Sequence, residues 1–242
     1  MRRISGVLGV RRLSTLNHPG SGSRNRLLLY SLGGLTLGGL AGYYVDQGLF
    51  FSAIPTKDED AREYRAELER KLRKLAIVKN LQADGRYKEF VSWHRFDKEK
   101  VGKIFTAGTL SVPGGLTLSP LVFVDPNEKK TIAVVHCGHR LVGLPMMIHG
   151  GVIGTLLDEA LARTAFLSTN GTGVTANLKI NYKRPTIAHQ FLVIKTHTDN
   201  SQDDRKAWVS GTVETLDGQV LVDASALFVA PKTLKLQKMS EL

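Results

Sequence analysis

The chain contains a single cysteine, Cys137, among its 242 residues. One thiol can form neither an internal disulfide nor a zinc site built from cysteines, and we expect no metal site. Cys137 could act as a lone nucleophile, but no helix start adjoins it, and a half-buried strand position is the interpretation we favour.

Acidic residues are missing from the first 45 positions, which hold six arginines. These arginines supply +6 of the formal net charge of +11, so the rest of the chain carries only about +5, with both signs interspersed. Such a body lacks a basic stripe with stacking aromatics, which excludes nucleic acid as the main partner. Residues 1–23 are rich in arginine and serine, which is typical of a mitochondrial presequence.

Residues 27–45 contain no charged side chain. As a helix these nineteen residues would rise about 28 Å, close to a hydrocarbon core of roughly 30 Å. Gly34, Gly38 and Gly42 form a small-residue ridge that lets two membrane helices approach closely. We expect a single-pass membrane anchor over residues 27–48, in the inner mitochondrial membrane, with the flanking arginines on the matrix side. The alternative is a targeting segment that is cleaved off.

Residues 56–103 are expected to hold an amphipathic helix and a connector. The apolar residues at helical spacing are Tyr64, Leu68, Leu72, Leu75 and Val78. The other faces are charged, so this helix should lie on a partner surface, either its own domain or a second subunit. Thr56 and Glu59 form a plausible capping box at its start. Residues 82–103 show no pattern that predicts a defined element.

Residues 104–232 alternate between strand-like runs and one long apolar helix, and a short tail follows over 233–242. Two runs, 117–124 and 131–137, precede the helix; four follow it, at 173–182, 191–198, 206–215 and 220–229. This order predicts an α+β fold in which an antiparallel sheet buries the helix. Asparagine and lysine alternate with apolar residues over 176–183, which indicates a sheet with one wet face.

The predicted helix over residues 149–167 is apolar almost all round, yet it carries a carboxylate in its apolar stripe. Asp158 shares a face with Gly154 and Leu161, and no cation lies on that stripe. Glu159 points elsewhere and can pair with Arg163 as an ordinary surface pair. Burying an unpaired carboxylate costs several kcal/mol unless its pKa rises or a partner is supplied. Asp158 is therefore a candidate for chemistry, or else it bonds a neighbouring loop.

Two segments carry a resemblance to a known family. They are His149-Gly150-Gly151, with Asp158 nine residues after the histidine, and Val174-Thr175-Ala176-Asn177-Leu178-Lys179-Ile180-Asn181-Tyr182-Lys183-Arg184-Pro185. Residues 114–231 resemble the hotdog-fold acyl-CoA thioesterases of the phenylacetate-pathway type, especially their mitochondrial animal members. The presequence and anchor are similar to those of fungal membrane-tethered hotdog proteins of mitochondria.

This resemblance implies a sheet wrapped around one helix, a homodimer or dimer of dimers, and active sites at the subunit interface. It implies hydrolysis of acyl-CoA, with CoA present as part of the substrate and no separate cofactor. Asp158 would be the catalytic carboxylate, as general base or as nucleophile, and Thr175 would orient it or a water, within the chain or across the interface. The positions that align with CoA contacts in similar proteins are Asn181, Lys183, Arg205 and Ser210.

The start of the helix offers donors for the oxygen of a thioester carbonyl. Backbone amides at a helix start are unpaired and lie at the positive end of the dipole. Gly150 and Gly151 have no side chains to block a carbonyl, and His149 could donate to the same oxygen or cap the helix. The basic residues suited to CoA phosphates are Lys183, Arg184, Arg205 and Lys206, unless they form only a solvated sheet face.

Two other functions are compatible with the expected fold. One is a membrane-anchored scaffold whose hotdog domain binds acyl chains or a protein partner without turnover. The other is a hydratase or dehydratase, although the families with that chemistry have a different spacing between carboxylate and histidine. The set of His149, Asp158 and Thr175 favours hydrolysis.

Overall fold

The computed structural model describes residues 54–55, 57–93, 97–169, 172–203 and 205–231, together with Gly38. The predicted presequence and tail, and nearly all of the predicted anchor over 27–48, lie outside the described residues. Among the residues that are described, no helix is long and apolar enough to cross a bilayer.

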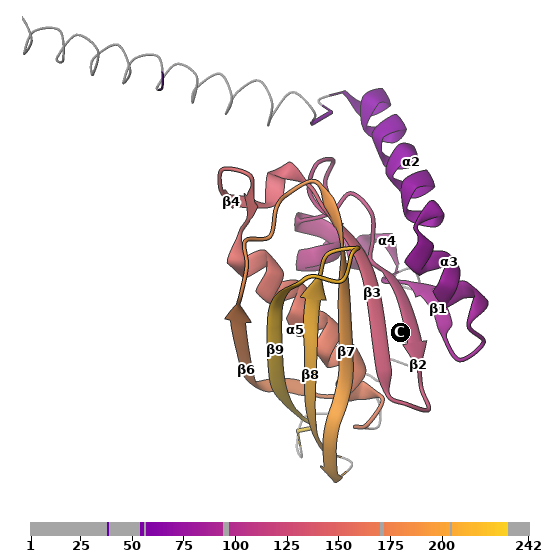
Figure 1. The fold of residues 1–242 in the computed structure, drawn as a ribbon, viewed down its shortest axis with the longest axis vertical. Helices are drawn as coiled ribbons and strands as arrows, with labels where there is room; N and C mark the ends of the chain where they lie inside the picture. The colour runs from indigo at the N-terminus through magenta and orange to yellow at the C-terminus, as the bar shows by residue number, and fades with distance from the viewer. Residues whose placement is uncertain are drawn as a thin grey trace, which may run out of the picture. The chain divides into compact units, whose positions relative to one another are not determined.

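A seven-stranded antiparallel sheet organises the fold (Figure 1). The strands lie side by side in the order β1-β2-β3-β7-β8-β9-β6. All six strands predicted from the sequence are present, with bounds β2 Leu121–Asp125, β3 Lys130–Cys137, β6 Val174–Tyr182, β7 Gln190–Asp203, β8 Lys206–Glu214 and β9 Val220–Val229. The seventh, β1 (Lys88–Val91), lies in the range where only a helix and a connector were expected.

One hydrophobic core lies between the sheet and helix α5 (Gly150–Phe166), which packs against β3, β6, β7, β8 and β9. Leu157 and Leu161 are fully buried in it. The sheet meets them with alternate residues of each strand, such as Val209 on β8 and Ala226 on β9. The prediction of an antiparallel sheet that wraps one apolar helix is therefore confirmed.

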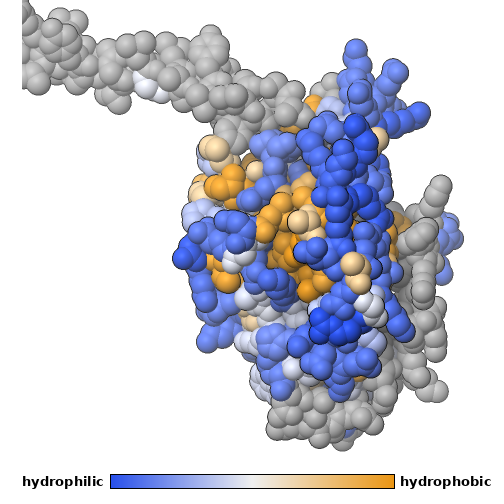
Figure 2. All heavy atoms as spheres, turned by 45° about the vertical axis from the view of Figure 1, so that its right-hand side comes forward, coloured by the Kyte–Doolittle hydropathy of each residue, from blue (hydrophilic) through white to orange (hydrophobic). Residues whose placement is uncertain are grey.

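A second core lies on the opposite face of the sheet, under helices α2 (Asp58–Lys74) and α3 (Ala76–Ala83). Leu68 and Leu72 of α2 pack with Phe123 and Phe191 of the sheet. The amphipathic helix thus covers a surface of its own domain, next to β1 and β2 (Figure 1). Its outward side is hydrophilic, and apolar residues show in the hollow beside it (Figure 2).

The predicted amphipathic helix is divided at Leu75, whose ψ of 134° ends α2 before α3 begins. No side chain caps the start of α2, which Lys57 precedes. Thr56, the first residue of the predicted capping box, lies outside the described residues. The change of direction lets Leu68 and Leu72 of α2, and Val78 and Leu81 of α3, all reach the second core.

Three short elements lead from β3 to α5. A 3-10 turn, η3 (His139–Leu141), precedes a small hairpin made of β4 (Val142–Leu144) and β5 (Met147–Ile148). Met146 at its tip has a φ of 65°. The hairpin is held to the segment after β6, because the Ile148 N–H donates to the Thr186 carbonyl at 2.8 Å. It lies at the same end of the domain as the start of α2 (Figure 1).

Candidate active site

Helix α5 and strand β6 run antiparallel along one edge of the sheet. Asp158, in the middle of the helix, contacts Thr175 near the start of the strand. Gly150, the first helical residue, contacts Tyr182, the last residue of the strand. The candidate site therefore has two parts, one around Asp158 and one at the start of the helix.

The Asp158 carboxylate is half-buried and is bonded to a neutral hydroxyl. Thr175 Oγ1 donates to Asp158 Oδ1 at 2.8 Å, within the same chain. Asp158 takes part in no ion pair with another described residue. A carboxylate that one hydroxyl orients and no cation neutralises can accept a proton from water or attack a carbonyl carbon.

His149 caps the start of α5. Its Nδ1 accepts the Gly151 N–H at 2.9 Å, so this amide is already bonded. Because Nδ1 accepts, the neutral ring carries its proton on Nε2, which stays available as a donor. The Gly150 N–H has no acceptor among the described residues, so of the two glycine amides it is the one open to a ligand.

Two further residues fix this helix start, and the sequence did not single them out. Tyr182 Oη donates to the Gly150 carbonyl at 2.7 Å, which ties the helix to the end of β6. Gly143 of β4 leaves room for the imidazole, since a Cβ there would lie 2.7 Å from His149 Cδ2. The sequence did hold a signal for Tyr182. The alternation along β6 places Tyr182 on the same face as Ile180, and that face is turned toward α5.

A cleft of about 540 Å³ opens at the start of α5. Its walls are the β4–β5 hairpin, the helix start and the segment after β6, with lining residues Gly143, Leu144, Met147, Ile148, His149, Gly150, Ile153, Tyr182, Lys183, Arg184, Pro185 and Thr186. Asp158 is not among them. It lies eight residues further along α5, which is about 12 Å along the helix axis.

The four residues that the resemblance aligns with CoA contacts are spread along the sheet. Lys183 forms a 3.2 Å ion pair with Asp223 at the cleft end, where Asn181 lies opposite the same aspartate. The pair with Lys183 lowers the pKa of Asp223.

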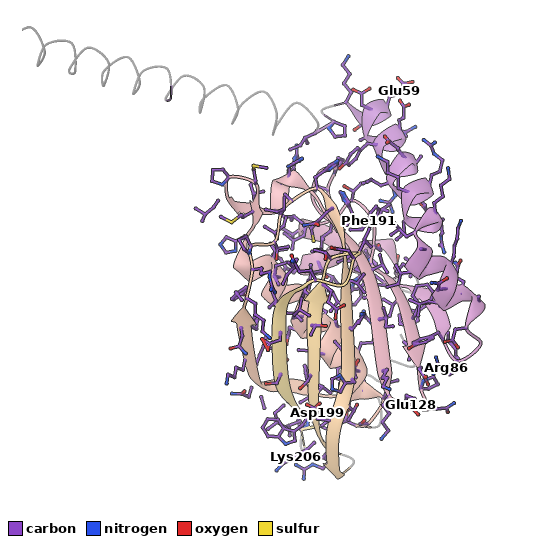
Figure 3. The ribbon with its side chains drawn as sticks, in the orientation of Figure 1. Glu59, Arg86, Glu128, Phe191, Asp199 and Lys206 are labelled. Atoms are coloured by element: carbon purple, nitrogen blue, oxygen red, sulfur yellow. The ribbon has the colours of Figure 1, made fainter. Side chains whose placement is uncertain are left out.

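The other two residues lie further along the strands, away from the cleft. Ser210 donates to Asp199, and Arg205 directs Nε to the Ala230 carbonyl at 3.5 Å. Asp199 and Lys206 lie near the β7–β8 turn, at the end of the sheet opposite the cleft (Figure 3). One chain alone does not bring all four together.

Glu159 and Arg163 do not form the surface pair expected from their spacing. Glu159 is half-buried, and its Oε1 accepts from Thr106 Oγ1 at 2.5 Å in the π-turn η2 (Phe105–Thr109). Burial raises the pKa of Glu159 and lowers that of Arg163, which donates to Ser92 Oγ. The expectation was wrong because Thr106 and Ser92, which lie outside α5, contact the two side chains instead.

Cys137 ends β3 and is fully buried. Burial raises the pKa of its thiol to about 12, so no thiolate forms near neutral pH. The strand position is confirmed, although it is more buried than expected, and a role as a lone nucleophile is excluded.

Comparison with known proteins identifies relatives of this chain. The family described as the thioesterase superfamily matches residues 147–208. The uncharacterized mitochondrial membrane protein FMP10 of Saccharomyces cerevisiae is 32% identical over 202 residues, which cover 78% of this chain and 80% of FMP10. The acyl-coenzyme A thioesterase THEM4 of Mus musculus is 32% identical over 136 residues, 56% of this chain and 58% of THEM4. The solved PaaI protein from the phenylacetic acid degradation operon of E. coli is 14% identical, with a TM-score of 0.40 over 43% of this chain and 74% of that one.

Proposed function

Because this chain belongs to the thioesterase superfamily, we propose that it hydrolyses acyl-CoA thioesters to a free fatty acid and CoA. The observation that carries the proposal is the half-buried Asp158 carboxylate, with the Thr175 hydroxyl bonded to one oxygen and no cation of the described residues paired with it. A carboxylate held in this way can activate a water molecule or attack the thioester itself. The name of THEM4 supports the same substrate class.

The residues divide the work of thioester hydrolysis. Asp158 acts as the general base on water or as the nucleophile, and Thr175 orients its carboxylate through Oδ1. The Gly150 N–H, at the positive end of α5, stabilises the oxyanion that forms on the carbonyl oxygen. His149 keeps this helix start in shape by capping Gly151. We propose no metal and no cofactor for the reaction.

The separation of Asp158 and Gly150 supports an active site shared by two copies. In a productive site the base, the attacking water, the carbonyl group and the oxyanion donor follow one another over roughly 9 Å. Asp158 and Gly150 are separated by about 12 Å along α5, which is more than this span. Eight residues also turn the helix by about 80° beyond two full turns, so the two groups face different directions. Two antiparallel copies of α5 would bring Asp158 of one subunit beside Gly150 of the partner subunit.

Strand β6 supports the same arrangement. Within the part of the chain that the structure describes it is an edge strand with β9 as its one partner, and seven of its nine residues are exposed. A long edge with unpaired backbone groups invites pairing with another chain. We propose a homodimer, or a dimer of dimers, in which two sheets join through β6.

The CoA moiety would bind along the basic residues of both subunits. Lys183 and Arg184 line the cleft beside Gly150 and suit the phosphates, and Asn181 lies two residues before Lys183, opposite Asp223. Arg205 precedes the pair that is level with Val174, at the other end of β6, and Ser210 lies on β8, with β9 between it and β6, so a second copy would supply both.

The test is CoA release by the purified full chain from acyl-CoAs of several chain lengths, measured with a thiol reagent. We expect release by the wild-type chain and a loss of at least a hundredfold in Asp158→Asn, which keeps the shape and the Thr175 contact but removes the base. Thr175→Ala should show a smaller loss. Release of no CoA from any substrate would favour a non-catalytic scaffold, and equal rates would show that Asp158 is not the catalytic group.

Single turnover in oxygen-18 water can reveal a covalent role of Asp158. Label that enters the enzyme's carboxylate indicates a covalent anhydride intermediate. Label in the released fatty acid alone is the result both of direct attack by water and of an anhydride that water opens at its acyl carbon.

We further propose that the protein resides in mitochondria as a single-pass membrane protein of the inner membrane. The names of FMP10, a mitochondrial membrane protein, and of a mitochondrial Candida albicans relative support the organelle. The uncharged residues 27–45 would form the anchor after a presequence over 1–23. Protection of a C-terminal tag from protease in mitoplasts tests the orientation, with the domain expected in the intermembrane space.

A further inference from the structure

Three exposed apolar side chains gather on the lip of the cleft. Leu144, Met146 and Ile187 are 62%, 47% and 43% exposed. Leu144 and Met146 belong to the β4–β5 hairpin, and a bridge between Met147 and Ile187 holds the third beside them. The Ala188 N–H also donates to the Met146 carbonyl at 2.8 Å. We call Leu144, Met146 and Ile187 the apolar tip.

The apolar tip lies beside positive charge. Lys183 and Arg184 line the same cleft, and Arg140 lies in η3, two residues before the hairpin begins. Apolar side chains flanked by basic ones are the composition of surfaces that insert into the headgroup region of a bilayer. Asp223 pairs with Lys183 in this cleft, and Asp58, Glu59 and Asp60 stand in the first turn of α2 at the same end of the domain, so the positive charge next to the apolar tip comes from Arg184 and Arg140.

The fold brings Ile54, which follows the predicted membrane anchor in sequence, close to the base of the β4–β5 hairpin. The Ile54 side chain lies 3.1 Å from the point that a Cβ on Gly114 would occupy. The Arg140 side chain lies 3.5 Å from the same point. The described chain therefore begins next to the base of the hairpin. Residue 54 follows the end of the predicted anchor at 48 by six residues, which reach at most about 20 Å.

We propose that the apolar tip contacts a phospholipid bilayer, so that the cleft receives long-chain acyl-CoA from the membrane surface. This inference rests on the proposed function for its substrate, but the membrane contact stands on the apolar tip and on where the chain emerges. The long acyl chain of such a substrate lies in the bilayer, and its CoA moiety lies in water. The apolar side chains at the edge of the cleft suit the acyl chain, and the basic side chains suit the CoA phosphates.

The first experiment measures the contact without using activity. A nitrobenzoxadiazole label is attached to Met146→Cys in the full chain, reconstituted in vesicles of phosphatidylcholine and phosphatidylglycerol. Cys137 is fully buried, so the introduced thiol takes the label selectively. The matched control is Phe105→Cys, since Phe105 is 55% exposed on η2, outside the apolar tip.

We expect the label at residue 146 to shift its emission to the blue and to lose intensity when the lipids carry nitroxide groups. The label at residue 105 should do neither. A blue shift at 146 without quenching by lipid nitroxides would show that a second copy of the chain covers the tip, and water-like emission would show that nothing does. Either result overturns the proposal.

The second experiment measures the substrate route. Met146→Asp and Ile187→Asp place charge on the tip, and aspartate tolerates the positive φ at 146. For palmitoyl-CoA in vesicles we expect KM to rise about tenfold for each substitution, because burial of one aliphatic side chain is worth at least that factor. Hydrolysis of soluble hexanoyl-CoA, and both activities of Phe105→Asp, should not change.

The two proposals fail in different ways. Quenching at residue 146 in a protein that releases no CoA would remove the proposed function and leave the membrane contact. Hydrolysis with no quenching, or an equal effect of Met146→Asp on both substrates, would remove the membrane contact and leave the thioesterase.

Discussion

Replacement of Gly150 by proline should remove one N–H group from the candidate active site and leave the helix in place. Gly150 is the first residue of α5, a position where proline is favoured because its missing N–H has no intrahelical acceptor. His149 before it has φ −59° and ψ 131°, which a residue preceding proline readily adopts. The nearest atoms of Tyr182 lie 3.4 Å from a Cβ at this position, an ordinary contact.

The expected loss follows from the role of that amide. Removal of one oxyanion donor typically lowers kcat by about 10²–10³, or roughly 3–4 kcal/mol of transition-state stabilisation. Gly150→Ala adds the same Cβ but keeps the N–H, and it should retain most of the rate. The assay is kcat for CoA release at saturating acyl-CoA, with thermal unfolding to show that both variants fold. Equal rates for Gly150→Pro and Gly150→Ala would refute the assignment of this amide.

The same variant tests whether two subunits share a site. In an equal mixture of Gly150→Pro and Asp158→Asn chains, half of the dimers contain one chain of each kind. A shared site pairs Asp158 of the first chain with Gly150 of the second, so each mixed dimer has one intact site of two. We expect about a quarter of the wild-type rate. A site contained in one chain would leave the mixture as inactive as its components.

Three further predictions concern stability and are tested by urea unfolding. Tyr182→Phe removes the hydrogen bond to the Gly150 carbonyl and should cost about 0.5–1.5 kcal/mol, seen as a lower midpoint at unchanged slope. Leu157→Ala, in the centre of the α5 core, should cost about 2–5 kcal/mol, and a loss below 1 kcal/mol would mean that the helix is less tightly packed than described. Burial of His136 lowers its pKa to about 4, against about 6.5 in the unfolded chain, so the unfolded state binds more protons as the pH falls between these values. The contribution of neutral His136 to the free energy of unfolding is fully present above pH 6.5 and should fall by about 3 kcal/mol by pH 4. His136→Phe should flatten this part of the dependence of the unfolding free energy on pH.

The regular elements were predictable where a periodic pattern ran long enough. The alternation over 220–229 and the apolar run over 149–167 each identified an element close to its observed bounds. Strand β1 has only four residues, three of them exposed, so it carries no alternation. The break at Leu75 was also invisible, because the helical spacing continues through Val78 without a proline or glycine.

The candidate site was predictable in its residue types but not in its contacts. A carboxylate on an apolar stripe pointed to Asp158, but its hydrogen bond from Thr175 joins residues 17 apart on different elements. The hydrogen bond that Glu159 accepts comes from Thr106, which is 53 residues away in a π-turn where only strand-like runs and one helix were expected. Contacts of this kind arise from the packing of one element on another, and spacing within an element does not encode them.

The placement of the two hydrophobic cores on opposite faces of one sheet bears on how the protein opens. Detachment of α2 and α3 would bare Phe123 and Phe191 without disturbing the residues around Leu157. Such partial opening requires less free energy than global unfolding. Amide hydrogens of the two N-terminal helices should therefore exchange with deuterium sooner than those of α5 and the central strands, and protease attack near Leu75 should precede collapse of the rest.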